Sequence, residues 1–393
     1  MREEIIEYLN IFDLDIRKIG DARFMDQKCT PDVVCFIADC VINTIESNQI
    51  FTVSDIWNSQ YFIKNTRAIF NKPWATDDRA KSEYDKFIQQ PLRMLGYAQI
   101  LEVTKQGNQN YYRIKNESIL DYIAQRERNT YNFLYCYLKK VFTDSELWRY
   151  FLEYKNNPNS DTFNDLKTRF TRFIIGHTSI NGEVEVHRIF PKILNIFAVE
   201  THLPGSEKGR ISKFVYTFSD LMYNRKNWRD LNKDKTITRQ EAEMNAIDIV
   251  QQEAYNTYYV QKAIALIQKI QRESEVYDQW GIGEATQVHH IFPKALYPEI
   301  AHYVENLIKL TATQHYTKAH PSNRTQEINK DYQLTCLLAK ADTIEKSLRR
   351  FGEKYYRKES FIFVCSIGLS VEIELNLSFA DLKNLLIRVY NAA

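Results

Sequence analysis

The chain has 393 residues and an almost balanced charge, with 52 Lys and Arg against 50 Asp and Glu and a formal net charge of +2. Hydrophobic residues make up 44% and charged residues 26%, which excludes a disordered or fibrous protein. The length corresponds to roughly two to four domains. Gly and Pro number only 11 and 9. We therefore expect a multi-domain α+β protein that is predominantly helical.

The six cysteines form no Cys-x-x-Cys pair, so no structural zinc is expected and a cytoplasmic location is favoured. The N-terminus lacks the layout of a signal peptide, and no apolar run approaches the roughly 20 residues that span a bilayer. A membrane partner is therefore not expected. The near-zero net charge argues only weakly against a nucleic-acid partner, because a local basic patch is sufficient for phosphate binding.

Residues 1–130 form the first predicted domain. One amphipathic helix is predicted over residues 33–48 and another over 77–95, and two strands follow on either side of a turn at Gly107 and Asn108. Helices followed by a hairpin with a polar tip resemble a winged-helix module, which would make this region a DNA-recognition domain. A plain structural hairpin is the alternative.

Residues 131–275 form the second predicted domain, which is helical and aromatic-rich over 131–175. In the basic segment 205–238, aromatic residues alternate with Lys and Arg. This composition suits contacts with phosphates and bases; the alternative is a solvated surface with a small core of its own. On the first interpretation, Arg210, Arg225 and Arg229 contact phosphate. A long helix is then predicted from about 239 to 275.

Five of the eight histidines lie within residues 289–320. They are His289, His290, His302, His315 and His320. A strand is predicted before Pro293 and a second one over residues 306–311. Thr311 and Gln314 then match a capping box, which places His315 in the first turn of a helix. This order of strand, loop, strand and helix allows His289, His290 and His315 to converge.

This segment, predicted as a domain of residues 276–325, resembles the HNH, or ββα-metal, nuclease finger. The family has a His-containing pair on the first strand, an Asn-Leu opening the second, and a His nine residues after that Asn, which matches Asn306 and His315. The run His-Ile-Phe-Pro resembles HNH domains of bacterial restriction enzymes. The resemblance implies that His290 is the general base and that Asn306 orients it.

The resemblance also implies a cofactor, one divalent metal ion held by His289 and His315. Mg²⁺ is the first expectation, with Mn²⁺ or another ion as alternatives. Lys318 and Lys294 would contact phosphate. Colicin-type members of the family carry a third ligand four residues after the last His, where this chain has Ala319. His302, Glu305 and His320 are left unassigned, the last because five residues do not return to the same face of an α-helix.

An upstream segment, residues 186–194, repeats residues 288–296 at seven of nine positions. A degenerate finger, a DNA-contacting segment and coincidence all remain open. Arg188 stands where the base would be, and no Asn followed by a His at nine residues comes after it. We favour a noncatalytic role in which Arg188 and Lys192 contact phosphate.

Residues 326–393 form the last predicted domain, with a helix to about 352, a strand pair near 360–375 and a final helix near 378–391. Together these features predict a site-specific double-stranded DNA endonuclease that resembles a bacterial type II restriction enzyme. The resemblance implies cleavage that leaves 5′-phosphate ends and a cognate DNA methyltransferase as partner. A homodimer is left open. Alternatives are a modification-dependent or homing HNH nuclease, and a winged-helix DNA-binding regulator with a degenerate finger.

Overall fold

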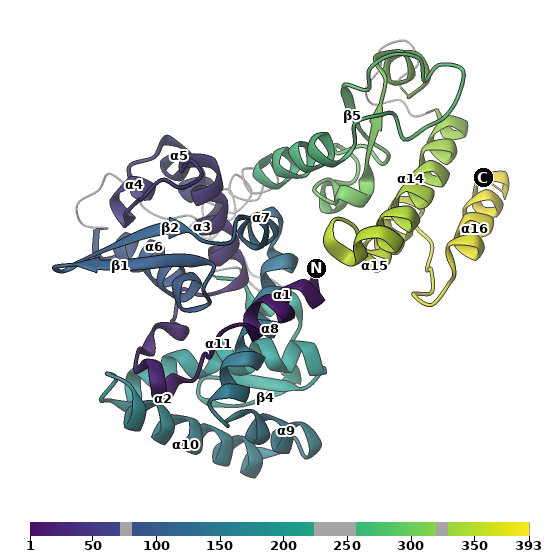
Figure 1. Cartoon of the computed structure of the whole chain (residues 1–393). Helices are drawn as coiled ribbons and strands as arrows, with labels where there is room; N and C mark the ends of the chain where they lie inside the picture. The colour runs from purple at the N-terminus through teal and green to yellow at the C-terminus, as the bar shows by residue number, and fades with distance from the viewer. Residues whose placement is uncertain (71–80, 224–256, 320–328, 393) are drawn as a thin grey trace, which may run out of the picture. The chain divides into compact units, whose positions relative to one another are not determined.

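The computed structural model describes residues 1–70, 81–223, 257–319 and 329–392. The chain forms two compact units, an N-terminal unit, Arg2–Glu243, and a C-terminal unit, Met244–Ala393, which also includes Met1. Most described residues are helical, and the strands among them form three two-stranded antiparallel sheets (Figure 1). The expected class, α+β and predominantly helical, is confirmed. None of the described helices is long and apolar enough to cross a membrane.

The first half of the N-terminal unit is built around α3 (Pro31–Thr44), in which every residue from Pro31 to Val41 is buried. A helix that is apolar on nearly all sides is stable only inside a core. The helices that contact α3 are α4 (Val53–Trp57), α5 (Gln60–Phe70), α6 (Lys81–Tyr97), α7 (Glu117–Gln125) and α8 (Glu127–Asp144). Before it come α1 (Arg2–Asn10), which packs on α8, and α2 (Ile16–Ile19).

The hairpin predicted in this unit is confirmed as β1 (Leu101–Gln106) and β2 (Gln109–Ile114). Gly107 at its turn has φ +60°, a conformation that glycine adopts without strain. A third segment pairs with the hairpin at one position, since Phe51 N donates to Tyr112 O at 2.9 Å and Tyr112 N donates to Phe51 O at 2.8 Å.

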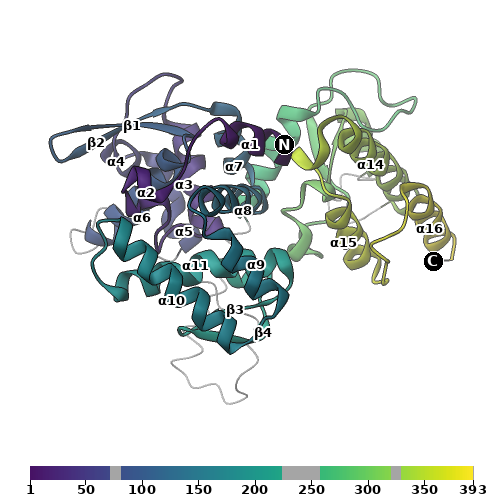
Figure 2. The same cartoon turned by 60° about the horizontal axis from the view of Figure 1, so that its bottom comes forward.

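The described part of the second half of the N-terminal unit, residues 148–223, includes helices and a hairpin (Figure 2). They are α9 (Trp148–Asn156), α10 (Ser160–His177), α11 (Glu183–Thr201), β3 (Pro204–Glu207) and β4 (Arg210–Val215). The helical prediction for 131–175 is confirmed. Aromatic residues of the basic segment pack inward: the rings of Phe218 and Tyr131 lie 5.7 Å apart, and those of Tyr223 and Phe87 lie 6.1 Å apart. This packing favours the small-core alternative for residues up to 223.

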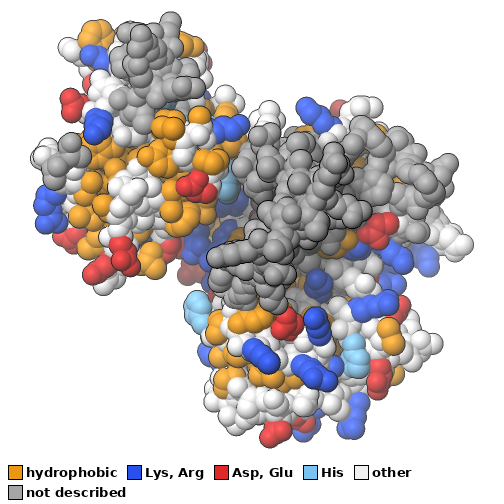
Figure 3. All heavy atoms as spheres, turned by 180° about the vertical axis from the view of Figure 1, so that it is seen from behind, with side chains coloured by type: hydrophobic (Ala, Val, Ile, Leu, Met, Phe, Trp, Pro, Cys, Tyr) orange, Lys and Arg blue, Asp and Glu red, His pale blue; other side chains and the backbone are white. Residues whose placement is uncertain are grey.

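The C-terminal unit has one hydrophobic core that joins all of its described elements. These are a helix over residues 257–270, β5 (Gln287–His290), β6 (Leu307–Leu310), α14 (Lys330–Phe351), α15 (Lys358–Leu369) and α16 (Phe379–Ala392). Hydrophobic side chains also reach the surface of this unit (Figure 3), and exposed ones include Leu375 and Ile387. The hairpin with the histidines therefore shares its core with the helices that follow it.

The strand pair predicted near residues 360–375 is wrong, because this stretch forms α15. The run from Phe361 to Cys365 has the aromatic and β-branched residues typical of strands, but four of its five side chains are buried in the helix. Burial against α14 and against the turn at Val304–Asn306 outweighs the weak local preference for strand. The C-terminal region is thus helical throughout its described elements.

Candidate active site

The histidine cluster lies on the β5–β6 hairpin and on the helical turn that follows it. The strands pair with His289 opposite Ile308 and His290 opposite Leu307. Because successive side chains of a strand point to opposite faces, His289 and His290 lie on different faces of the hairpin. The predicted order of strand, loop, strand and helical turn is confirmed.

The turn after β6 begins with the predicted capping box. Gln314 N donates to Thr311 Oγ1 at 3.2 Å, and Thr311 N donates to Gln314 Oε1 at 3.0 Å. The same side chain reaches further than the capping pattern predicts, since Gln314 Nε2 donates to the carbonyl of Val276 at 2.8 Å and to Asp278 Oδ1 at 2.9 Å. Gln314 therefore fixes this turn to the segment that precedes β5.

The turn itself is a π-helix, Gln314–Ala319, and not the expected α-helix. A π-helix has i→i+5 backbone hydrogen bonds in place of the i→i+4 bonds of an α-helix. Ala319, at the position of the family's third ligand, is buried and offers no donor atom. His320 lies outside the described residues.

His289 and His315 come together at this junction. Their rings meet edge to face with centroids 5.3 Å apart. Two imidazoles that share one ion hold their centroids roughly 5–6 Å apart, because each ligating nitrogen lies about 2 Å from the metal. At this separation the two rings are close enough to share one ion. Among the described residues, no group of three or more His, Cys, Asp or Glu side chains is arranged to hold a metal.

Asn306 fastens the loop between the two strands. Its Oδ1 accepts from Phe292 N at 2.9 Å, while its Nδ2 donates to the carbonyls of Phe292 at 3.0 Å and Ile300 at 3.3 Å. The side chain is fully buried, so these bonds form away from water. Asn306 thus braces the loop.

His290 is held by that loop. Its Nε2 lies 3.0 Å from the carbonyl oxygen of Ala301. A carbonyl only accepts, so Nε2 carries the proton of this bond, and the lone pair of the neutral ring is on Nδ1. Burial lowers the pKa of His290 below its usual value, the bond to Ala301 opposes this effect, and the charge of Lys294 adds to it. Burial therefore favours the neutral form of the ring.

Glu305 and His302, which the sequence left unassigned, both contact other parts of the fold. Glu305 is fully buried, and its Oε1 accepts from Arg357 N, the residue that precedes α15, at 2.9 Å. The ring of His302 lies against those of Tyr303 and Tyr259, with centroids 4.9 Å and 6.4 Å away. Among the described residues, neither forms with the His289–His315 pair a group of three that could hold a metal.

Two lysines flank the hairpin. The ammonium of Lys318 lies 4.6 Å from the centre of the Trp280 ring. Trp280 is one of the site residues that sequence reasoning missed, because only its position beside the helical turn reveals it. Lys294 is exposed in the loop that Asn306 braces.

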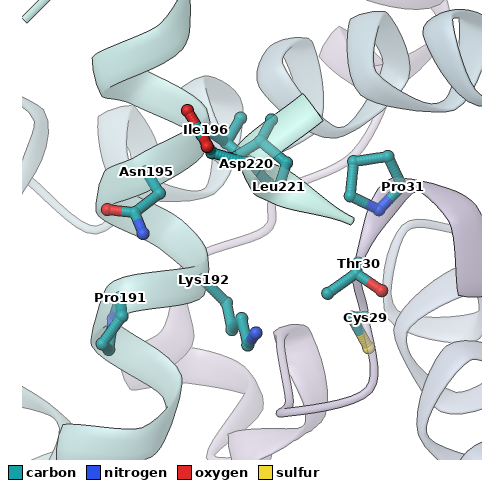
Figure 4. A pocket seen from close by; sticks show the side chains of 9 residues that line it. All are labelled: Cys29, Thr30, Pro31, Pro191, Lys192, Asn195, Ile196, Asp220 and Leu221. Atoms are coloured by element: carbon teal, nitrogen blue, oxygen red, sulfur yellow. The ribbon is translucent and has the colours of Figure 1, made fainter. Parts of the chain in front are cut away.

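The upstream repeat has a different structure from the finger. Residues 186–194 belong to α11, so a second ββα finger is excluded. Arg188 is exposed on this helix. Lys192 instead lines a cavity of about 30 Å³, beside Thr30 and Asp220, and burial lowers its pKa (Figure 4). A cavity that holds about one water molecule does not suit a contact with duplex phosphate.

The remaining predicted phosphate contacts lie in the N-terminal unit. Arg210 is exposed at the start of β4. Arg225 and Arg229 lie outside the described residues. The structure thus brings His289 and His315 together, and holds His290 through the loop that Asn306 braces. Lys192 lines a small cavity and is not part of an exposed basic surface.

In comparisons with protein-family models, curated proteins and solved structures, none matches this chain.

Proposed function

We propose that the protein is a site-specific double-stranded DNA endonuclease of the HNH type, with its nuclease site in the C-terminal unit. The observation that carries this proposal is the meeting of His289 and His315 beside a hairpin whose loop, braced by Asn306, holds His290. These side chains supply a candidate metal site and a general base, the two elements that phosphodiester hydrolysis requires.

In the proposed reaction, His290 Nδ1 accepts a proton from a water molecule. The water oxygen attacks phosphorus, and the bond between phosphorus and the 3′ oxygen breaks. The products are a 5′-phosphate and a 3′-oxygen that is protonated by solvent. The lowered pKa of His290 favours the neutral form that this step needs, and Asn306 keeps the loop that orients the ring.

His289 and His315 would hold one divalent metal ion. When bound, such an ion stabilises negative charge on the phosphate and the leaving oxygen. Mg²⁺ is the first expectation, but two nitrogen donors are more typical of Ni²⁺ or Zn²⁺ than of Mg²⁺. Activity is therefore best measured with Mg²⁺, Mn²⁺, Ni²⁺ and Zn²⁺ in parallel. Lys318 and Lys294 are the proposed phosphate contacts.

Recognition is assigned to the N-terminal unit. Three features support a winged-helix-like module there: the buried α3, the long α6 directly before the β1–β2 hairpin, and the pairing of Phe51 with Tyr112. A cognate methyltransferase as partner and protection of host DNA follow from the restriction-enzyme proposal.

The first test is plasmid cleavage with each metal, comparing the wild type with His290→Ala. Loss of a general base typically costs 10²–10⁴-fold in rate, so cleavage by His290→Ala should fall by at least about 100-fold. His187→Ala is the matched control, because His187 occupies the equivalent of His289 in the upstream repeat and lies in α11. Equal cleavage by wild type and His290→Ala, or cleavage that survives EDTA, contradicts the proposal.

A second candidate is a DNA-binding regulator with a degenerate finger. It is favoured by one observation, that within the described residues no group of three or more potential ligands is arranged for a metal. This function predicts sequence-selective binding without cleavage under any of the four metals. A modification-dependent or homing nuclease is separated from a restriction enzyme by comparing methylated with unmethylated DNA.

A further inference from the structure

Trp280, on the segment that precedes β5, contacts one of the two lysines proposed to bind phosphate. The ammonium of Lys318 lies 4.6 Å from the centre of its ring, within the range of a cation–π interaction. Trp280 is 37% exposed, so this contact forms at the surface of the unit. Lys318 belongs to the turn Gln314–Ala319 and follows His315 by three residues. The ring therefore meets the lysine on the same turn that carries a proposed metal ligand.

The backbone of Trp280 is joined to that turn from both sides. Its N–H donates to Asp278 Oδ1 at 2.9 Å, and its carbonyl oxygen accepts from Thr311 Oγ1 at 3.0 Å. Asp278 Oδ1 also accepts from Gln314 Nε2 at 2.9 Å. Thr311 and Gln314 are the two residues of the capping box, so these bonds fix the segment with the ring to the start of the turn that bears Lys318.

The contact restrains a side chain that is otherwise costly to order. A lysine side chain has high rotamer entropy, which is lost when its ammonium binds a phosphate. A ring face attracts the ammonium without neutralising its charge. Within the described part of the chain, Lys318 forms no ion pair with a carboxylate. Lys294, the other proposed phosphate contact, is exposed and lies over no aromatic ring among the described residues.

We propose that Trp280 is a positioning residue that holds the ammonium of Lys318 for contact with a phosphate of the bound DNA. The lysine is then partly ordered before DNA arrives, and preorganisation of this kind raises affinity. The energy of a cation–π contact at an exposed site corresponds to roughly 2–5-fold in affinity. This inference rests on the proposed function, since it assigns a role in binding the same substrate.

The test is a double-variant cycle on DNA affinity, measured with the full chain. The His290→Ala background keeps the DNA intact, and fluorescence anisotropy of a labelled duplex that the wild type cuts measures the affinity. In this background Trp280→Leu should lower the affinity roughly 2–5-fold, and Trp280→Phe, which keeps an aromatic face, should lower it less. When Lys318→Met is already present, Trp280→Leu should have no further effect.

Two controls separate positioning from a general structural role. Tyr277→Leu alters an aromatic residue of the same segment that is 83% exposed, and it should leave the affinity unchanged. Lys294→Met and Trp280→Leu should have additive effects, because no contact joins these two residues in the described structure. Lys318→Met should also reduce the slope of log affinity against log salt by about 1, as expected for the loss of one phosphate contact.

The outcomes distinguish this inference from the proposed function. If Trp280→Leu lowers the affinity by the same factor with and without Lys318→Met, Trp280 acts independently of the lysine and the positioning role is overturned. Unchanged affinity in Trp280→Leu has the same consequence. In both cases cleavage by the wild type leaves the nuclease proposal standing. If the wild type neither binds nor cuts DNA with any of the four metals, both proposals are overturned.

Discussion

Asn306 and Gln314 are both fully buried, and each uses its amide to join segments that are distant in sequence. Asn306 closes the loop that holds His290, and Gln314 joins the turn that carries His315 to residues 276 and 278. The positions of His290 and His315 therefore depend on neutral amides. A buried amide whose partners are removed leaves polar groups unsatisfied, so substitutions here should be costly.

Replacing Asn306 by Ala should lower both stability and cleavage. The change leaves Phe292 N and two carbonyls without their partner, and each buried unsatisfied group costs about 1–3 kcal/mol, so a loss of about 3 kcal/mol in the free energy of unfolding is expected. Urea denaturation measures the loss. Asn306→Asp keeps an oxygen that accepts from Phe292 N. Its second oxygen also only accepts, so it repels the carbonyl oxygens of Phe292 and Ile300, and this variant should not restore stability. Wild-type stability in Asn306→Ala would contradict the bracing role.

The histidine pair gives a second prediction at this scale. His289→Ala or His315→Ala removes one of two proposed nitrogen donors, so the affinity for Mn²⁺ or Ni²⁺ should fall by at least about 10-fold. Calorimetric titration of each variant measures this directly and does not depend on cleavage. His187→Ala should bind the metal as the wild type does. If both His289→Ala and His315→Ala bind the metal as tightly as the wild type, the proposal that these residues hold the metal is contradicted.

At the scale of elements, hairpins were predictable where local patterns carry the information. Strand alternation and turn residues identified β1–β2 and β5–β6, and the capping pattern at Thr311 and Gln314 identified the turn after β6. The π-helical winding of that turn was not predictable, because no local pattern distinguishes it from an α-helical turn. The contacts of Gln314 with residues 276 and 278 were missed because they depend on tertiary structure.

Two apolar segments show why composition was insufficient elsewhere. Residues 186–194 form a helix with Pro191 inside it, whereas the matching residues 288–290 form a strand. The flanking chain decides, since 288–290 has β6 as its partner and 186–194 continues a helix that begins at Glu183. Similarly, α15 is helical because its apolar residues fill a core on several sides.

The packing of α15 against the hairpin gives a prediction for Gly368. A Cβ at this position would lie 2.4 Å from carbon atoms of the buried Phe292 ring, so Gly368→Ala must displace that ring. Overpacking of this kind typically costs about 1–3 kcal/mol. Thermal unfolding should show the loss, and adding Phe292→Leu should recover part of it.

Gly176→Ala is the matched control for Gly368→Ala. Gly176 lies inside α10, and an added Cβ would meet no atom within 4 Å. Alanine in a helix interior is favoured over glycine by about 0.5–1 kcal/mol, so this variant should be slightly stabilised. A Gly368→Ala protein as stable as Gly176→Ala would show that α15 does not press on the hairpin loop.

At the scale of the whole molecule, the chain forms two units, and the C-terminal unit has a hydrophobic core of its own. Within that core, Lys340 is fully buried and donates to Glu275 at 3.1 Å and to Tyr356 Oη at 3.2 Å. Glu275 in turn accepts from Lys309 N of β6 at 2.8 Å. This buried ion pair links α14 to the hairpin, so its loss should affect the C-terminal unit selectively.

Lys340→Met leaves the Glu275 carboxylate buried without its cation, which typically costs about 3–5 kcal/mol. The six free cysteines report where the loss occurs, because all are buried and four, Cys29, Cys35, Cys40 and Cys136, lie in the N-terminal unit. Cys336 and Cys365 lie in the C-terminal unit, and burial raises the pKa of both thiols. In Lys340→Met, Cys336 and Cys365 should become labelled at a lower urea concentration than in the wild type. The urea concentration at which the other four thiols become labelled should be unchanged.

The double variant Lys340→Met/Glu275→Gln tests the cause. It removes both charges but keeps an acceptor for Lys309 N, so most of the lost stability should return. Site-resolved labelling by mass spectrometry measures all six thiols in one experiment. If all six thiols in Lys340→Met become labelled at the same lower urea concentration, the two units unfold together, and the stability of the C-terminal unit then depends on the N-terminal unit as well.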